Sequence, residues 1–431
     1  MERKLSALLK EWKNRDGRMP LIIYGARQVG KTFTVLEFGR TEYERCLHIN
    51  FENNRRAASL FEDDISPKRL VSLLEGMYGQ TISPGKTLVF FDEIQSCERA
   101  LTSLKYFREE SPEYHIIAAG SLPGLALNRE KYSFPVGNVE SLTLYPMDFQ
   151  EFLMALGRDM LVPEIRSCYA EDRKMPEGLH RELLELYRLY LITGGMPKVV
   201  KEYANTKKLV NLLSIQNEIL DNYIADMSKY ALAAETVRIK ACYDSIPVQL
   251  AKENRKFQYK TVKSGGSAAI FGVSIEWLSL SGLVLKCQKC NSAAIPLAAY
   301  TNQGAFKLYM GDTGLLIAKS NFPYELLLSG LETDNTFLGA IAENYTACAL
   351  AASGHALYYW ESDNTAEVDF VIQKGAAAIP VEVKAGVHVK SRSLSVFREK
   401  YGNEYAIRIS AKNFGFENNI KSVPLYAAFC V

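Results

Sequence analysis

Hydrophobic residues are spaced in three ways along this chain, and each spacing predicts a different element. Short apolar runs at 21–24, 47–51, 88–91 and just before Ser121 are typical of strands buried on both faces. Apolar residues three and four positions apart, at 5–12 and over 157–230, predict helices. Apolar and charged residues alternate at 366–386, AEVDFVIQKGAAAIPVEVKAG, which predicts two strands joined by a turn at Lys374 and Gly375.

The loop after the first strand carries GARQVGKT, which fits the phosphate-binding pattern GxxxxGK[ST] between a strand and a helix. Glycines there let backbone N–H groups surround phosphates, and the helix N-terminus adds a favourable dipole. We expect Lys31 to reach the β- and γ-phosphates of ATP and Thr32 to ligate Mg²⁺. The predicted nucleotide-binding residues are Gly25, Ala26, Arg27, Gln28, Val29, Gly30, Lys31, Thr32 and Phe33.

The strand at 88–91 ends in Asp92 and Glu93. The carboxyl ends of parallel strands form the ligand-binding edge of an open α/β sheet. We therefore expect Asp92 to hold Mg²⁺ through water and Glu93 to orient or deprotonate the attacking water. Ser121 ends another strand and is a candidate hydrogen-bond partner of the γ-phosphate or the water, although a serine there can also be a helix cap.

Hydrolysis also needs a cation that neutralises charge in the transition state. Arg27, Lys105 and Arg108 are candidates, in their own subunit or a neighbour's. Taken singly, each is better interpreted as a solvated surface charge.

The segment 232–320 has the outline of a winged helix, with a helix, a basic loop, a second helix and a strand pair. Arg255, Lys256 and Lys260, interleaved with Phe257 and Tyr259, predict contact with nucleic-acid phosphates and bases. The alternatives are a solvated lysine loop and a protein-docking module.

In the alternating run, Glu367, Asp369 and Val371 are expected on one strand face. A hairpin would bring Asp369 across from Glu382, and the two carboxylates are candidate Mg²⁺ ligands. Lys384 is a candidate for positioning the water or the phosphate. A helix upstream offers Glu343 to the same catalytic cluster. The alternative is a structural ladder of salt bridges.

At these motifs the chain resembles a known family. The resemblance rests on GARQVGKT, FFDEIQ, AAGSLPGL, VESLTLYPMDFQEFL, YLITGGMPKVV and FKLYMGDTGLL, and it covers nearly the whole chain. The chain resembles prokaryotic AAA-type ATPases with a C-terminal domain of unknown function, which implies a PD-(D/E)XK nuclease-like fold in that domain. Glu343, Asp369 and Glu382-x-Lys384 resemble the nuclease signature. Asn138 departs from the family pattern, because relatives often carry an arginine there.

The predicted fold class is α/β. We expect a P-loop AAA-type ATPase domain with a parallel sheet at 1–156, a helical lid at 157–231 and a winged-helix-like module at 232–320. An α+β, restriction-endonuclease-like domain of the PD-(D/E)XK type is expected at 321–431.

Composition and charge restrict the class of protein but do not indicate a particular function. The formal net charge of +2 neither requires nor excludes nucleic acid. The N-terminal residues, with Leu5, Leu8, Leu9 and Trp12 at helical spacing, predict an amphipathic helix rather than a signal peptide. No run reaches the roughly 18 apolar residues of a membrane span. The eight scattered cysteines, including the pair in CQKC, are expected to be reduced, as in a cytoplasmic protein.

The sequence thus predicts an ATP- and Mg²⁺-dependent ATPase that couples its nucleotide state to nucleic-acid binding or processing. The alternative is a nucleotide-dependent switch or assembly protein whose inactive nuclease-like fold docks proteins. A ring-shaped homo-oligomer is a further hypothesis, since AAA relatives often take the charge-neutralising arginine from a neighbour.

Overall fold

The structure divides into two compact units. It is a computed structural model that describes residues 2–121, 135, 137–230, 233–329, 336–362, 366–386 and 392–431. The N-terminal unit comprises residues 2–145 and the C-terminal unit residues 146–431. No helix among the described residues is long and apolar enough to cross a membrane.

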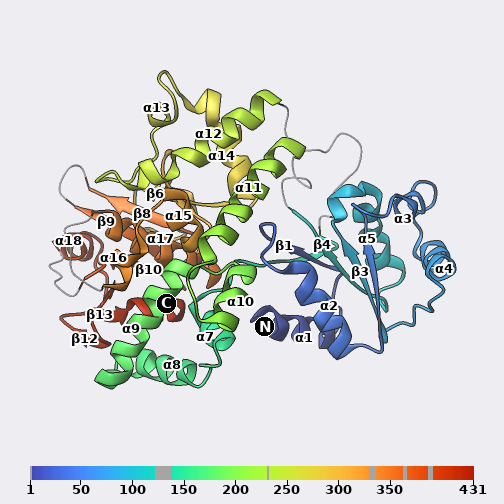
Figure 1. The fold of residues 1–431 in the computed structure, drawn as a ribbon, viewed down its shortest axis with the longest axis horizontal. Helices are drawn as coiled ribbons and strands as arrows, with labels where there is room; N and C mark the ends of the chain where they lie inside the picture. Colours follow the sequence, from blue (N-terminus) through green and yellow to red (C-terminus); the bar gives the residue numbers. More distant parts are fainter. Residues whose placement is uncertain are drawn as a thin grey trace. The chain divides into compact units, whose positions relative to one another are not determined.

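The N-terminal unit contains a five-stranded, wholly parallel sheet in the order β2-β3-β4-β1-β5 (Figure 1). Its strands are β1 (Leu21–Tyr24), β2 (Arg45–Asn50), β3 (Thr87–Asp92), β4 (His115–Ala119) and β5 (Glu140–Thr143). Its described helices are α1 (Leu5–Asn14), α2 (Lys31–Glu42), α3 (Arg55–Ser59), α4 (Pro67–Tyr78) and α5 (Glu98–Glu110). The predicted α/β fold with a parallel sheet, typical of P-loop NTPases, is confirmed.

Both faces of this sheet are buried, which explains the continuous apolar runs of its strands. In β3, Val89 and Phe91 belong to the core cluster shared with α4 and α5. Phe90 points to the opposite face and is buried as well. Helix α1 is amphipathic as predicted, but Leu8 is 44% exposed, so Leu5, Leu9 and Trp12 alone form its buried stripe.

The C-terminal unit is built on an eight-stranded mixed sheet in the order β12-β13-β11-β10-β9-β8-β6-β7. Its strands are β6 (Val284–Cys290), β7 (Thr301–Met310), β8 (Tyr358–Glu361), β9 (Glu367–Lys374), β10 (Ala377–Val383), β11 (Ala406–Ser410), β12 (Gly415–Glu417) and β13 (Ile420–Pro424). Its described helices are α7 (Phe149–Ala155), α8 (Leu161–Glu171), α9 (Glu177–Thr193), α10 (Pro197–Thr206), α11 (Leu212–Tyr230), α12 (Ala233–Leu250), α13 (Tyr259–Val262), α14 (Ala268–Leu280), α15 (Thr313–Ser320), α16 (Tyr324–Leu328), α17 (Thr336–Ala352) and α18 (Arg392–Tyr401).

The expected order of helix, basic loop, helix and strand pair at 232–320 is present as α12, α13, α14, β6 and β7. The strand pair is also part of the large sheet, because Gln288 and Lys289 of β6 pair with Tyr358 and Tyr359 of β8. Residues on both sides of the predicted boundary at 320 therefore share one sheet. The cysteines of CQKC lie in β6, and both are buried free thiols.

Three of the motifs that carry the family resemblance meet at one buried junction. Gly195 of the TGGMP segment accepts a hydrogen bond from Met147 N at 2.7 Å, and its own N–H donates to Asp312 Oδ2 at 2.6 Å. Tyr190 donates from its hydroxyl to Met147 O at 2.7 Å. Asp312 also caps α15 by accepting from Leu315 N at 2.9 Å, and burial raises the pKa of its carboxyl to about 6. The motifs thus tie α7, α9 and α15 together.

Close backbone contact explains the glycines of this junction. A Cβ on Gly195 would lie 2.0 Å from Met147 O. A Cβ on Gly194, which has a φ of 68°, would lie 2.2 Å from Asp312 Oδ1. The TGGMP and GDTG motifs therefore build the framework of the C-terminal unit, and their glycines are required by packing.

We expect Gly195→Ala to destabilise the C-terminal unit by about 1–3 kcal/mol, the usual cost of overpacking a tight site. Gly178→Ala is the matched control, because Gly178 lies in α9 with open space at its Cβ position. That control should be neutral or stabilising by up to about 1 kcal/mol. Native-state hydrogen exchange of α9 and α15 across a urea series measures both. Equal stability of the two variants would contradict the junction.

Candidate functional site

The predicted phosphate-binding loop has the backbone geometry that its glycines imply. It leaves β1 after Tyr24 and enters α2 at Lys31. Three of its residues adopt positive φ angles: Gly25 at 148°, Gln28 at 65° and Gly30 at 96°. A Cβ on Gly25 would lie 2.2 Å from Leu144 O, so this position excludes any larger residue. The loop therefore presents successive backbone N–H groups at the N-terminus of a helix, which is an arrangement that binds phosphates.

Lys31 lies within the curve of this loop. Its ammonium donates to Gly25 O at 2.8 Å and to Ala26 O at 2.9 Å, and the residue is buried. The side chain is thus held at the position from which a phosphate oxygen can be contacted.

Arg3 supports the same loop and was not predicted. Its guanidinium donates to Val29 O and to Tyr145 O, each at 2.7 Å, and the residue is buried. Arg3 therefore joins the N-terminal segment, the phosphate-binding loop and the end of the segment after β5. An arginine two residues from the chain start gives no local signal for this role, because its partners are backbone carbonyls far along the chain.

Thr32 and Asp92, each predicted to contact Mg²⁺, lie side by side in the structure. Thr32 Oγ1 donates to Asp92 Oδ2 at 3.0 Å, and Asp92 is buried at the end of β3. A hydroxyl and a carboxylate are oxygen ligands of the kind that Mg²⁺ prefers, and nucleotide phosphates and water supply the rest of its octahedral shell. These residues therefore fit a nucleotide-bound Mg²⁺.

Two further residues hold the Asp92 carboxylate and were missed from the sequence. His48 Nε2 lies 3.2 Å from Asp92 Oδ2, and Asn50 Nδ2 donates to the same oxygen at 3.3 Å. Both come from β2, whose Asn50 is in register with Asp92. The sequence did carry a signal for them, because His48 and Asn50 are the polar residues of the otherwise apolar strand CLHIN.

Glu93 stands at the same sheet edge in an unusual backbone conformation, with a φ of 51°. The side chain of Gln95 donates from Nε2 to Glu93 Oε2 and accepts at Oε1 from Ser121 N at 3.3 Å. Glu93 and Ser121 are thus linked through one amide. The catalytic roles of Lys31, Glu93 and Ser121 remain predictions.

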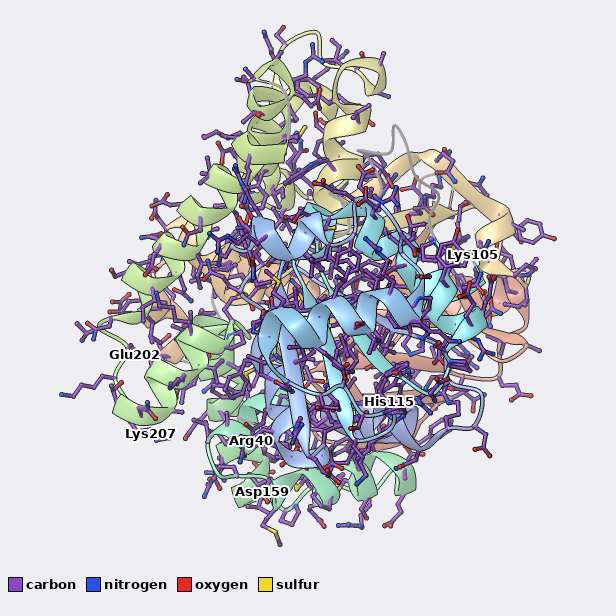
Figure 2. All side chains as sticks on the ribbon, turned by 90° about the vertical axis from the view of Figure 1, so that its right-hand side faces the viewer. Arg40, Lys105, His115, Asp159, Glu202 and Lys207 are labelled. Atoms are coloured by element: carbon purple, nitrogen blue, oxygen red, sulfur yellow. The ribbon has the colours of Figure 1, made fainter. Side chains whose placement is uncertain are left out.

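The structure does not single out one of the candidate cations. Arg27 Nη2 lies 3.7 Å from Glu52 Oε2. Lys105, labelled in Figure 2, lies on α5 with Nζ 3.9 Å from Glu109 Oε1 of the same helix. Arg108 on α5 is partly buried. Phe33, the last residue of the predicted loop, is exposed on α2.

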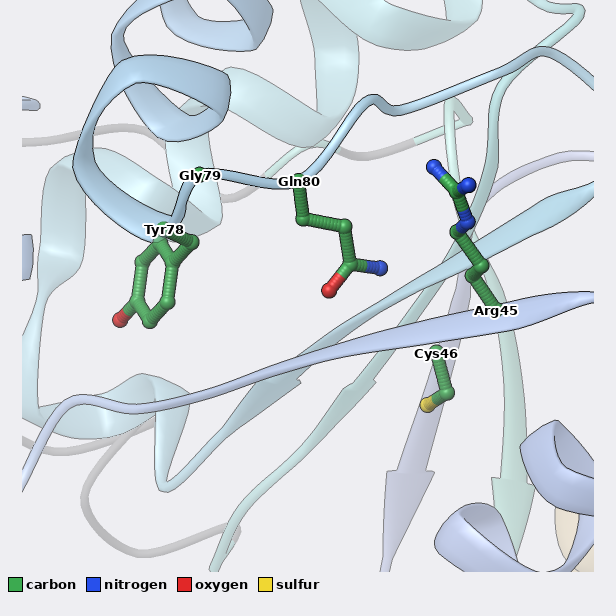
Figure 3. Close-up of a pocket in the computed structure, with 5 residues that line it drawn as sticks. All are labelled: Arg45, Cys46, Tyr78, Gly79 and Gln80. Atoms are coloured by element: carbon green, nitrogen blue, oxygen red, sulfur yellow. The ribbon is translucent and has the colours of Figure 1, made fainter.

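A separate pocket of about 510 Å³ is lined by Arg45, Cys46, Tyr78, Gly79 and Gln80 (Figure 3). Arg45 and Cys46 begin β2, whereas the phosphate-binding loop follows the end of β1. Because the strands are parallel, the pocket lies at the opposite edge of the sheet from the nucleotide site. Burial raises the pKa of the Cys46 thiol to about 11, so the thiol is protonated at neutral pH.

In the C-terminal unit, β9 and β10 form the predicted antiparallel hairpin, with Phe370 opposite Val381. Asp369 Oδ2 accepts from Val383 N at 2.8 Å. Glu382 is buried, with Oε1 3.5 Å from Lys384 Nζ and Oε2 3.8 Å from Arg408 Nε. The ion pair between Glu382 and Lys384 is of the kind expected if these charged residues form a structural ladder of salt bridges instead of a metal site.

The strict alternation expected along β9 is wrong at one place. Val371 was expected on the face of Glu367, but it packs beside Val368 in the core cluster with α18. The pairing of β8 with β9 shifts by one residue between Val368 and Val371, which is a β-bulge. A bulge inserts one residue and turns the following side chains to the other face, and such features re-aim side chains near functional sites.

Glu343, which we expected to join Asp369 and Glu382, lies in an ion-pair cluster with basic residues. It is fully buried and accepts from Lys307 Nζ at 3.0 Å, from the Tyr309 hydroxyl and from Arg255 Nη1. Lys307 is also 2.7 Å from Glu367 Oε1. Among the residues that the structure describes, no group of three or more His, Cys, Asp or Glu side chains is arranged to hold a metal ion. The sequence did not reveal that a loop and a neighbouring strand would supply cations to Glu343.

Two of the three predicted nucleic-acid contacts are engaged by carboxylates. Arg255 is bound to Glu343 and only 20% exposed, and Lys256 is bound to Glu361. Lys260 on α13 is exposed. Phe257, expected to stack on bases, is buried against Phe306 with ring centroids 5.4 Å apart. The second long helix of this segment, α14, contains neither Lys nor Arg.

One family model covers most of the N-terminal unit. A family model described as an AAA domain matches residues 17–153. This match supports an AAA-type ATPase. Two models described as domains of unknown function, DUF8612 and DUF4143, match residues 184–325 and 338–428. No curated protein matches the chain.

Several solved structures are similar at low identity. A Walker-type ATPase of Pyrococcus abyssi is 13% identical, with 74% of this chain and 95% of that chain covered and a TM-score of 0.45. The ORC2 protein of Aeropyrum pernix is 16% identical, with 79% and 92% covered and a TM-score of 0.35. DnaA of Aquifex aeolicus is 13% identical, with 64% and 87% covered and a TM-score of 0.30.

The Glu343 cluster generates a stability prediction. Lys307→Met should destabilise the C-terminal unit by about 3–5 kcal/mol, because it removes the buried cation between two carboxylates. Lys260→Met is the control, since Lys260 is exposed, and should stay within about 0.5 kcal/mol of the parent. Calorimetric melting of the full chain compares them. An unchanged Tm for Lys307→Met would show that the cluster contributes nothing.

Proposed function

We propose that this protein hydrolyses ATP in a Mg²⁺-dependent reaction at the edge of the parallel sheet. The observation that carries the proposal is the hydrogen bond from Thr32 to Asp92 beside the phosphate-binding loop. It brings the two predicted Mg²⁺ contacts together at the N-terminus of α2. The match of residues 17–153 to an AAA domain supports the same reaction.

Each residue has a defined task in the proposed reaction. The loop N–H groups and Lys31 bind and orient the β- and γ-phosphates. Mg²⁺, when bound with the nucleotide, draws charge from the phosphate oxygens. Thr32 and Asp92 would hold it, and His48 and Asn50 orient Asp92. Glu93 orients the attacking water and accepts its proton.

We expect Lys31→Ala and Glu93→Gln to fail in different ways. Lys31→Ala should lose ATP binding, because the phosphates lose their buried cation. Glu93→Gln should keep ATP affinity within about two-fold and lower kcat by about 100-fold or more, since only the step that uses the base is affected. Titration with a fluorescent ATP analogue and phosphate release measure the two quantities. Unchanged nucleotide affinity in Lys31→Ala would refute the site.

We also propose that the nucleotide state controls nucleic-acid processing by the C-terminal unit. Supporting this, the hairpin places Asp369 on β9, and Glu382 and Lys384 at the neighbouring strand β10 and its end. This spacing of two carboxylates and a lysine resembles the PD-(D/E)XK signature. A winged-helix role for 232–320 belongs to the same proposal and is supported by the exposed Lys260 near its basic loop.

A second candidate is a nucleotide-dependent switch whose nuclease-like fold is inactive and docks proteins. The observation that favours it is the Glu343 cluster, in which Arg255 and Lys307 neutralise the carboxylate expected at the metal. The engagement of Arg255 and the absence of basic residues from α14 also favour it over nucleic-acid contact.

A cleavage and binding assay separates these candidates. If the C-terminal unit is a nuclease, the parent cleaves plasmid or single-stranded DNA with Mg²⁺ or Mn²⁺, and Asp369→Asn and Lys384→Ala abolish cleavage. Glu417→Gln, at an exposed position of β12, is the control. Salt-sensitive DNA binding that weakens in Lys260→Ala supports contact through the basic loop. ATP hydrolysis without cleavage or DNA binding supports the switch.

A further inference from the structure

We propose that Gln95 is a positioning residue that fixes the Glu93 carboxylate relative to the end of β4. This inference rests on the proposed ATP hydrolysis, in which Glu93 acts on the attacking water. Gln95 lies two residues after Glu93, in the short 3-10 turn Ile94–Ser96 that follows β3. Its amide contacts Glu93, through which it would act on the reaction.

The contacts of Gln95 use both ends of its amide. Nε2 donates to Glu93 Oε2 at 2.5 Å, and Oε1 accepts from Ser121 N at 3.3 Å. One side chain therefore connects the predicted base, just after β3, with Ser121, two residues after the end of β4. These strands are direct neighbours, with Asp92 in register with Ala119. A shift at the end of β4 is thereby transmitted to the carboxylate.

The backbone is shaped to receive this side chain. A Cβ on Gly120 would lie 2.4 Å from Gln95 Oε1 and 3.2 Å from Ile94 Cγ2. Gly120 does not have a positive φ, so an alanine there meets no backbone strain and acts through these two side chains, of which Gln95 is the closer. The glycine between β4 and Ser121 is therefore explained by the room that Gln95 needs.

The contact has a specific chemical use. A carboxylate can rotate freely unless one oxygen is held, and a base must lie within hydrogen-bond reach of the water it activates. Donation from Nε2 occupies Oε2 and leaves Oε1 for the water. Because Glu93 itself sits at a φ of 51°, the side chain starts from a fixed and uncommon backbone direction.

The first test compares Gln95→Ala and Gln95→Glu in the full chain. Both should lower kcat for ATP hydrolysis by about 10- to 100-fold, because Glu93 loses its donor, while the Kd of a fluorescent ATP analogue stays within about two-fold. Glutamate has the shape of glutamine but offers no N–H donor, so retained activity in Gln95→Glu would assign Gln95 a packing role only. Ser96→Ala, in the same turn but exposed, is the control for disturbance of the turn.

The second test uses Gly120→Ala. This substitution lies just after β4 and displaces the Gln95 side chain without changing Gln95 itself. It should reproduce the loss in kcat, and the double variant Gln95→Ala/Gly120→Ala should be no slower than Gln95→Ala alone, since both remove one interaction. Losses that multiply would overturn the link between β4 and Glu93.

Failure of this inference is distinguishable from failure of the proposed function. Parent-like kcat in Gln95→Ala, with hydrolysis abolished in Glu93→Gln, would reject the role of Gln95 and retain Glu93 as the base. Hydrolysis that persists in Glu93→Gln would reject the proposed base, and Gln95 with it.

Discussion

The parallel register of β1, β2, β3 and β4 is the constraint on which the nucleotide site depends. Because these strands pair in parallel, their carboxyl ends all lie at the same end of the sheet. The phosphate-binding loop, Asp92 and Ser121 therefore meet although they are far apart in the chain. Reversal of any one strand would send its polar terminal residues to the opposite edge, where the Cys46 pocket lies.

Around this end of the sheet, several residues position the candidate site residues through hydrogen bonds. Arg3 holds the loop backbone, and His48 and Asn50 hold Asp92. Gln95 holds Glu93. Such contacts fix side chains whose chemistry requires a narrow range of positions. Arg3, the β2 pair and Gln95 belong to three separate segments, so the site depends on the packing of the whole N-terminal unit.

In the C-terminal unit, ion pairs between buried residues are more prominent. Its large sheet places carboxylates close to cations, and a buried carboxylate is tolerated only when it is paired. Glu343 satisfies this condition with Arg255 and Lys307, which come from a loop and from β7. The same pairing stabilises the fold and occupies a residue that a metal site would use. The junction of Met147, Gly195 and Asp312 shows likewise that the motifs of this unit encode backbone packing.

The sequence alone determined the P-loop, the parallel sheet, the amphipathic α1 and the β9–β10 hairpin, because each depends on residues that are neighbours in the chain. The signals were a strand–loop–helix motif, the spacing of apolar residues and a turn at Gly375. It also named Thr32 and Asp92 as candidate Mg²⁺ contacts, and the structure shows the hydrogen bond that joins them. Only the tertiary structure decided the partners of Glu343, the bulge in β9 and the contacts of Arg3, His48 and Gln95. Those features join segments that are distant in the chain, or depend on a register shift of one residue, and no local pattern of side chains specifies them.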